Sequence, residues 1–506
     1  MNYNLAYPFY LHSIKRPDNP ALWVDGATYS YRELAEQACR IAVWLQQVTN
    51  SKPKRVAILA HREIAAYRAI LGTCWSGACY VPLNPHFPDQ RLATIITLAN
   101  PDALIVDRQM LERLTPELLS DFTGPILIAD GDSVCCQGQA YDSFDLLPAP
   151  DDITSPALVN ATAEAYLIFT SGSTGTPNGV AVSTGSLDFS IRVISHHYPF
   201  VEADRFSQFF DLSFDFSVMD LFVPWLAGAI TYVVPDTQKL APGRFIVDHQ
   251  LTVWTCVPSQ ITNMAQMKLL KSGLFPSLRY SFFSGEMLTE EAARLWQDAA
   301  TNGSLVNLYG QCETIIASLA HNYAPDAAGN DEKRSVALGT QLDGILVAIV
   351  NKEGAFVHPG EKGEIAISGP HVAAGYLDNP QRTVVKFRNL EHPVYGVLPW
   401  YITGDLGLQD SNGVFHFLGR ADNELKVKGH RVLLEEVEHY LRQCSDCQVV
   451  AVHPCLSPAG TPEALVGFVV GGTIDEKIVK GCLREVLPDR WSTFTVSAKR
   501  SLPVWH

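Results

Sequence analysis

The chain is 506 residues long, and 47% of its residues are hydrophobic while 18% are charged. Single hydrophobic cores stop growing near about 250–300 residues, so a chain of this length divides into two or more domains. The 38 Lys and Arg against 53 Asp and Glu give a net charge of −15, which argues against nucleic acid or an anionic membrane as the main partner.

The N-terminal stretch lacks the charged leader, apolar core and small-residue cleavage site of a secretory signal. No window approaches about 18 uncharged apolar residues, the length that a membrane helix needs. We therefore expect a cytoplasmic protein with no membrane segment.

The 11 cysteines are scattered, apart from the neighbouring Cys135 and Cys136. They show no repeated CxxC spacing and no matching histidine spacing. This pattern predicts reduced, buried thiols in place of a disulfide framework or a zinc site.

Short apolar runs bounded by turn residues alternate with helix-period stretches through most of the chain, as at 55–60, 79–83, 103–107 and 125–130. This rhythm is typical of βα units whose parallel sheets are covered on both faces, and it predicts an α/β fold. Between Gly360 and Phe417 the runs become short and alternating with glycine turns, which predicts an antiparallel or barrel-like region.

The pattern changes again after residue 423. A charged hairpin, a helix at 433–444 and strands at 449–454 and 465–470 predict a small α+β domain. We expect a large domain over residues 1–421, a small domain over 422–506, and a hinge at Asp422.

A buried-strand run at 166–169 leads into the segment TSGSTGTPNG, residues 170–179. Glycine allows the backbone to approach a polyphosphate closely, and hydroxyl and backbone N–H groups donate to phosphate oxygens. The segment follows neither the Walker pattern nor GxGxxG. A flexible surface loop is the alternative. The expected phosphate contacts are Thr170, Ser171, Gly172, Ser173, Thr174 and Gly175.

The loop resembles the signature of the adenylate-forming superfamily, which includes acyl-CoA synthetases, luciferases and the amino-acid adenylation domains of nonribosomal peptide synthetases. Six further segments resemble the superfamily in its order: TYSYRELA, GACYVPLNP, GEIAISGPHVAAGYL, YITGDLG, GRADNELKVKGHRVLLEEVE and LPDRW. The resemblance implies two doubly wound βα subdomains and a distorted β-barrel, followed by a mobile α+β C-terminal domain. It also implies that ATP and Mg²⁺ are used.

The same resemblance implies roles for residues near the nucleotide. Glu313 would be the magnesium-side carboxylate, and Tyr309 would stack on adenine unless it is a core tyrosine. Asp405 would accept from the ribose hydroxyls, with Arg420 as a second ribose contact, unless Asp405 only forms a turn. Thr170 and Gly429 join Glu313 as expected catalytic residues. The other expected nucleotide contacts are Asn307, Leu308, Gly310, Gln311, Cys312 and Phe417.

The chain departs from the superfamily at three places. Asn178 stands where a lysine is common, and Gln311-Cys312 stands where Pro-Thr is usual. The usual C-terminal lysine does not occur before His506, so we expect either a longer or disordered tail or a protein that lacks this cation. The loss of the lysine at Asn178 favours slower pyrophosphate chemistry.

Asp215, in the segment SFDFSVMD, matches the aspartate that pairs with the α-ammonium in amino-acid-activating members. Bulky side chains at Phe216, Met219 and Phe282 would leave a shallow, uncharged cavity. The substrate is therefore expected to be a small neutral amino acid, alanine-like or proline-like. The expected pocket residues are Asp215, Phe216, Met219, Thr255, Phe282, Ser284, Leu308, Ile316 and Ala317.

The chain also resembles stand-alone D-alanine:carrier-protein ligases, through FDFSVMDLF, VWTCVPS and SFFSGEML. Ser284 and Leu308 differ from the residues usual in those enzymes, so L-alanine, serine and proline stay open beside D-alanine. The resemblance implies formation of an aminoacyl-AMP and transfer to the phosphopantetheine arm of a separate carrier protein, with Gly429 approaching the thiol tunnel. The alternatives are an acyl- or aryl-CoA synthetase and a degenerate nucleotide-binding protein.

Overall fold

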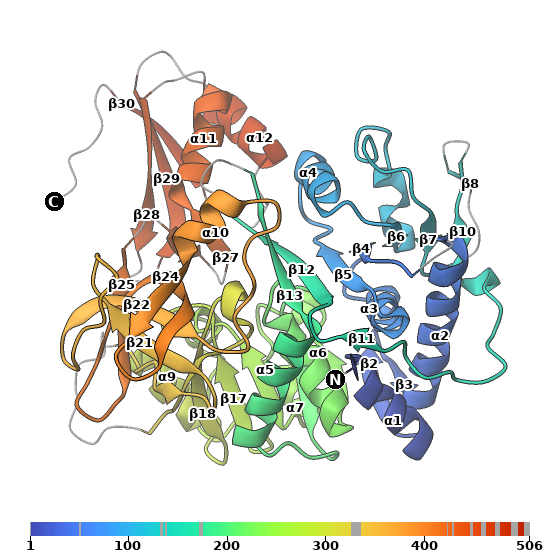
Figure 1. The fold of residues 1–506 in the computed structure, drawn as a ribbon, viewed down its shortest axis with the longest axis horizontal. Coiled ribbons are helices and arrows are strands. Elements are labelled where there is room, and N and C mark those ends of the chain that lie inside the picture. Colours follow the sequence, from blue (N-terminus) through green and yellow to red (C-terminus); the bar gives the residue numbers. More distant parts are fainter. Residues whose placement is uncertain are drawn as a thin grey trace.

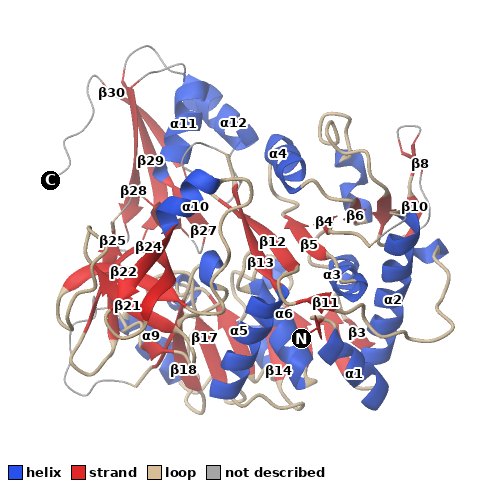
Figure 2. Cartoon of the chain, in the orientation of Figure 1, coloured by secondary structure: helices blue, strands red, loops and turns tan. Residues whose placement is uncertain are grey.

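The computed structural model describes residues 2–49, 52–131, 135–136, 139–171, 176–324, 335–421, 424–427, 430–445, 449–456, 462–470, 476–486 and 494–499. Helices cover both faces of two large sheets, a third sheet lies beside them, and the C-terminal segment packs at one end (Figures 1 and 2). The predicted α/β class with an additional β region is confirmed.

The first large sheet has seven strands in the order β10-β7-β6-β4-β5-β12-β13. All neighbouring strands run parallel except β12 and β13, which form an antiparallel hairpin. The strands are β4 (Arg55–Leu59), β5 (Cys79–Leu83), β6 (Ala103–Val106), β7 (Ile126–Ile128), β10 (Asp142–Ser143), β12 (Glu164–Thr170) and β13 (Asn178–Ser183).

Helices cover this sheet on both faces because its strands are apolar on both sides. Val56 and Ile58 belong to the core shared with α2 (Tyr31–Val48) and α3 (Ile64–Ser76), whereas Ala57 and Leu59 belong to the core shared with α4 (Asp89–Ala99). This alternation is the two-residue period of a strand. The predicted runs at 55–60, 79–83, 103–107 and 125–130 all contain strands.

The second large sheet has nine strands in the order β20-β19-β18-β17-β16-β14-β15-β2-β3. The central strands β18 to β2 run parallel, and β3, β19 and β20 are antiparallel additions at the edges. The strands are β2 (Pro20–Val24), β3 (Ala27–Ser30), β14 (Arg205–Gln208), β15 (Ile230–Val233), β16 (Val253–Cys256), β17 (Tyr280–Phe283), β18 (Ser304–Tyr309), β19 (Leu319–Asn322) and β20 (Thr340–Gln341).

The strand order of the second sheet reverses at β14, whose successor β15 lies on one side and β16 on the other. Ligands of open α/β sheets bind beyond the carboxyl ends of strands at such a point. The helices that connect or flank these strands are α1 (Tyr7–Lys15), α5 (Thr184–His197), α6 (Ser217–Ala227), α7 (Gly243–Asp248), α8 (Ser259–Gln266) and α9 (Glu290–Ala299).

The third sheet is antiparallel, as predicted for residues 360–417. It contains β21 (Leu346–Val350), β22 (Lys362–Ser368), β23 (Phe387–His392), β24 (Gly396–Gln409) and β25 (Phe415–Arg420), with α10 (Pro380–Lys386) before β23. Smaller elements are β1 (Asn2–Tyr3), β8 (Cys135–Cys136), β9 (Gln139–Ala140), β11 (Val159–Asn160), η1 (Arg108–Arg113), η2 (Phe144–Leu146), η3 (Asp236–Gln238) and η4 (Cys312–Thr314).

The C-terminal segment has a hydrophobic core of its own, built from Val437, Leu441, Val452, Leu465 and Leu483 among others. Its elements are β26 (Glu424–Val427), β27 (His430–Leu433), α11 (Leu434–Ser445), β28 (Val449–Leu456), β29 (Pro462–Val470), α12 (Glu476–Val486) and β30 (Phe494–Lys499). The predicted hinge at Asp422 lies outside the described residues, so the domain boundary stays a prediction.

One buried ion pair joins this segment to the large sheets. The Nη1 atom of Arg91, on α4, lies 2.6 Å from Oε1 of Glu436, on α11, and both side chains are buried. The helices α4 and α12 also contact each other in this region (Figure 1).

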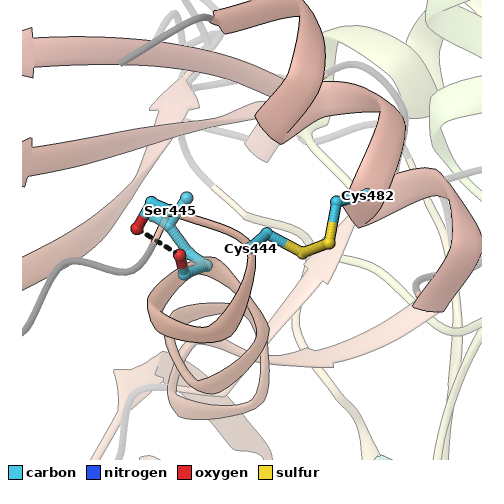
Figure 3. The surroundings of a disulfide bond; sticks show 4 residues. Cys444, Ser445 and Cys482 are labelled. Carbon is cyan, nitrogen blue, oxygen red and sulfur yellow. Dashed lines mark hydrogen bonds between the residues drawn. A yellow bond between two sulfur atoms is a disulfide. The ribbon is translucent and has the colours of Figure 1, made fainter. Parts of the chain in front are cut away.

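A disulfide joins Cys444 to Cys482 across α11 and α12 (Figure 3). The expectation of reduced thiols was wrong for this pair. The two helices pack side by side and bring the Cα atoms within 5.6 Å across a separation of 38 residues, and no local spacing in the sequence marks such a contact. Cys39, Cys74, Cys79 and Cys256 are free and buried, as expected.

No group of three or more His, Cys, Asp or Glu side chains within the described ranges is arranged to hold a metal ion. None of the described helices is long and apolar enough to cross a bilayer.

Candidate active site

The structure brings the predicted ribose residues together at the carboxyl end of the second sheet. Asp405, on β24, is 3% exposed, and Arg420, its register partner on β25, places Nη1 2.6 Å from Oδ1. The hydroxyl of Tyr309, at the end of β18, donates to Oδ2 of Asp405 at 2.6 Å. Burial and the nearby Asp405 carboxylate raise the pKa of Tyr309 well above its usual value, so this hydroxyl stays a donor.

Gln311, Tyr401 and Thr403 complete this cluster. The Gln311 carboxamide donates from Nε2 to Oδ2 of Asp405 at 2.8 Å and to the Thr403 carbonyl at 3.2 Å. The Tyr401 hydroxyl donates to Oε1 of Gln311 at 2.6 Å. Sequence reasoning assigned no role to Tyr401 or Thr403, although both lie in the YITGDLG segment that carries the resemblance.

Glu313 is fully buried in η4, just after β18. Its Oε1 accepts a hydrogen bond of 2.7 Å from the hydroxyl of Tyr376, which sequence reasoning also missed. A carboxylate suits Mg²⁺, which binds proteins through one or two carboxylates together with substrate phosphates. The buried carboxylate of Glu313 fits that mode.

The phosphate segment connects the two strands of the β12–β13 hairpin. Thr170 ends β12 and lies opposite Asn178, which begins β13. The Thr170 hydroxyl donates to the Asn178 carbonyl at 3.4 Å, and the Asn178 amide donates to the Ser171 carbonyl at 3.1 Å. Asn379, at the start of α10, donates to Oδ1 of Asn178 at 3.3 Å.

Asn178 is therefore buried at the base of the phosphate segment, where its amide joins Ser171 to Asn379. The predicted contacts Gly172, Ser173, Thr174 and Gly175 lie outside the described residues, as does Gly429.

Asp215 lies between β14 and α6, at the point where the strand order reverses, and is 7% exposed. Burial raises its pKa to about 6, while Lys426 on β26 and a hydrogen bond from Cys312 act in the opposite direction. Glu313 repels it and contributes to the rise. The predicted ammonium partner therefore lies close to the predicted metal carboxylate, with a cation of the C-terminal segment nearby.

The remaining pocket predictions fall mainly on buried apolar positions. Six of them, Phe216, Met219, Phe282, Leu308, Ile316 and Ala317, belong to the main hydrophobic core, and Ser284 is also buried. Thr255 is buried on β16, but its hydroxyl donates to Asp220 at 2.6 Å and lies 3.2 Å from the Ser207 hydroxyl. Its polar group is thus used inside the fold, where it ties β16 to α6.

The turn after Glu313 has an uncommon backbone. Ile315 and Ile316 have φ values of +44° and +64°, a region that β-branched residues rarely adopt. Gly310 faces this turn, and a Cβ there would lie 2.6 Å from the Ile316 carbonyl oxygen. The close approach requires glycine at 310 and fixes the turn that carries Glu313.

Three residues predicted to contact the nucleotide are partly buried or are used in contacts within the fold. The amide of Asn307 donates to the Ala337 carbonyl at 2.9 Å, which anchors β18 to the segment before β20. Phe417, on β25, is half-buried and packs against the main core, and Cys312 is only partly exposed beside Asp215.

The two doubly wound sheets, the antiparallel sheet and this cluster of acidic and aromatic side chains define an adenylate-forming enzyme. The chain belongs to the family of AMP-binding enzymes, whose profile matches residues 11–377.

Solved and curated relatives agree with this class. The Vibrio cholerae adenylation domain AlmE, crystallised in complex with glycyl-adenosine-5′-phosphate, is 32% identical over 99% of this chain and 96% of that chain, with a TM-score of 0.88. The D-alanine–D-alanyl carrier protein ligase of Lactiplantibacillus plantarum is 26% identical over 90% of this chain and 85% of its own length.

Enterobactin synthase component F of Escherichia coli (strain K12) is 29% identical over 94% of this chain. That match covers 36% of the synthase, so the chain spans about a third of the length of such curated relatives.

Proposed function

We propose that the protein activates a small neutral amino acid as its aminoacyl-AMP and then transfers the aminoacyl group to the phosphopantetheine thiol of a carrier protein. The observation that carries this proposal is the buried carboxylate of Asp215 beside Glu313. The pKa of Asp215 stays raised although Cys312 donates a hydrogen bond to it and Lys426 lies nearby, so part of the cost of burying this charge remains. An α-ammonium group from the substrate would compensate it. Fatty and aryl acids have no group that could do so.

The chemistry follows from this placement. With its ammonium held at Asp215, the substrate carboxylate would face the α-phosphorus of ATP, whose ribose is held at Asp405. A carboxylate oxygen bonds to that phosphorus as the bond to the β-phosphate oxygen breaks, and pyrophosphate leaves with the electron pair. Glu313 would hold Mg²⁺, which neutralises phosphate charge when bound. Thr170 and Ser171 would contact the phosphates from the hairpin.

The substrate class follows from volume and charge. Phe216, Met219 and Phe282, the proposed walls of the pocket, are large and buried. A shallow apolar pocket excludes long and charged side chains, although it separates neighbours that differ by one methylene by only about 1–3 kcal/mol. The glycyl-adenylate in the AlmE complex supports the small end of this range and adds glycine to alanine, serine and proline.

The second half-reaction would use the C-terminal segment. We propose a boundary after residue 421 with a hinge at Asp422, and we propose that Gly429 approaches the thiol. The sulfur would bond to the carbonyl carbon of the adenylate as the bond to AMP breaks, and the thiol proton would leave with AMP or solvent. The core of this segment is its own, which supports movement as a body.

The test of the proposal is amino-acid-dependent ATP–pyrophosphate exchange with Asp215→Asn. We expect exchange to fall at least a hundredfold while ATP binding, measured by calorimetry, is retained. Asp211→Asn is the matched control, because Asp211 accepts hydrogen bonds from Ser213 in the same loop and asparagine can replace it. Unchanged exchange in Asp215→Asn would refute the ammonium-partner role.

A further inference from the structure

The carboxamide of Gln311 occupies a position between two functional strands. Gln311 follows β18 and is buried, and its side chain reaches the strand β24 that carries Asp405. Its oxygen accepts from the Tyr401 hydroxyl, and its nitrogen donates to Oδ2 of Asp405 and to the Thr403 carbonyl. All three contacts lie within 3.2 Å, so both ends of the amide are used.

This amide restrains the carboxylate of Asp405 directly. Oδ1 accepts from Arg420, and Oδ2 accepts from both Tyr309 and Gln311. An ionised carboxylate has about four acceptor positions, so three fixed donors define its plane and set the direction from which the ribose hydroxyls can approach it. Because Gln311 is also held by Tyr401, it cannot turn away from Asp405 without losing a second hydrogen bond.

A proline at position 311, the usual residue at this place in the superfamily, has no side-chain donor and could make none of these contacts. The departure from the usual sequence therefore adds an interaction at the nucleotide site.

We propose that Gln311 is a positioning residue for nucleotide recognition, which orients the Asp405 carboxylate toward the ribose hydroxyls of ATP. The proposal rests on the role of Asp405 in the proposed function. It predicts that Gln311 acts through the ribose hydroxyls only. A substrate without those hydroxyls should not sense the loss of the Gln311 amide.

The experiment compares ATP with 2′,3′-dideoxy-ATP in pyrophosphate exchange by the full chain. Gln311→Met keeps the side-chain length and removes the amide. We expect KM for ATP to rise about tenfold with kcat within about threefold, and kcat/KM for the dideoxy nucleotide to stay within about twofold. Gln409→Met, on the same strand as Asp405 but at its hairpin end, is the control and should change neither value.

Equal losses with both nucleotides would overturn the proposal, since they would mean a merely structural role. If the methionine variant does not fold, Gln311→Leu serves instead, because it removes the donor to Asp405 without placing a second acid beside that carboxylate. The same selective loss is then expected, and a loss shared by both nucleotides again refutes positioning. Asp405→Asn distinguishes failure of the ribose role of Asp405 from failure of the positioning role of Gln311. If Asp405→Asn does not alter the preference for ATP over the dideoxy nucleotide, Asp405 does not bind the ribose hydroxyls.

Discussion

Replacing Asp215 with asparagine should make the folded protein more stable at neutral pH while it destroys the proposed activity. Burial raises the pKa of Asp215 from 3.8 to about 6 in the folded state. The ionised form is therefore disfavoured in the fold, so the protein loses stability as pH rises from about 4 to 6 and does not regain it above that range. Asparagine does not titrate and escapes this loss.

The size of the effect follows from the pKa. A rise from 3.8 to about 6 corresponds to about 3 kcal/mol, at about 1.4 kcal/mol for each pH unit. Unfolding entropy near about 2.1 cal/mol/K per residue converts this free energy into about 3 °C of Tm for a chain of 506 residues. The difference in Tm between Asp215→Asn and the wild type should thus widen by about 3 °C between pH 4 and pH 7.

Calorimetry of the two proteins at half-unit pH steps measures this difference. Subtracting the wild-type curve cancels Asp220, a second buried carboxylate whose pKa is raised to about 7 and which both proteins share. A non-hydrolysable aminoacyl-adenylate should close the gap at pH 7, because its ammonium compensates Asp215 in the wild type alone. A Tm difference that does not change with pH would show that burial in the fold does not raise the pKa of Asp215.

Three further perturbations test other parts of the structure. Asn178→Ala removes two amide contacts at the base of the phosphate hairpin, and at about 1 kcal/mol each it should lower kcat/KM for ATP tenfold to thirtyfold. Arg91→Met leaves Glu436 buried without the guanidinium and should weaken docking of the C-terminal segment by about 3–5 kcal/mol, seen as faster hydrogen exchange in α11 and α12. Cys482→Ser opens a loop of 38 residues and should cost that segment up to about 4 kcal/mol.

Each of these has an internal control. Asn178→Lys should be no more active than Asn178→Ala, because lysine keeps neither amide contact. Wild-type activity in Asn178→Lys would show that the two amide contacts are unimportant. Arg91→Met combined with Glu436→Gln should recover much of the protection, and additive losses would contradict the ion-pair account. Wild type in reducing agent should match Cys482→Ser, whereas identical stability of the oxidised, reduced and variant proteins would refute the disulfide contribution.

Much of the fold was predictable because it depends on local patterns. The strands at 55–59 and 79–83 are continuous apolar runs, which parallel sheets require when helices cover both faces. The pairing of β2 with β15 was not predictable, because it joins residues about 200 positions apart and leaves no periodic signal. The same reason hid the contact between Cys444 and Cys482, whose helices meet only in the folded C-terminal segment.

The site shows the same division. Asp215, Glu313, Tyr309 and Asp405 are predicted as site residues from motifs, and the structure brings Tyr309 to Asp405 and Glu313 near Asp215. Where the chain departs from the usual motif, the sequence could not show which contacts the substituted residue makes, because those contacts depend on the neighbours that the fold brings to it.

Asn178 illustrates this limit. The sequence records only the loss of a lysine there, whereas the structure gives the amide two partners, Ser171 and Asn379. Thr255 illustrates the converse, since its position suggests a pocket residue but its hydroxyl is used by Asp220.

ATP–pyrophosphate exchange over a panel of acids shows whether the protein activates a small neutral amino acid. The panel contains the twenty amino acids, D-alanine, a fatty acid and an aryl acid, each at saturating ATP with Mg²⁺. We expect exchange to depend on glycine or on one of alanine, serine and proline, and Asp215→Asn to abolish it. Exchange supported by the fatty or aryl acid, with none from any amino acid, would show that the protein does not activate amino acids.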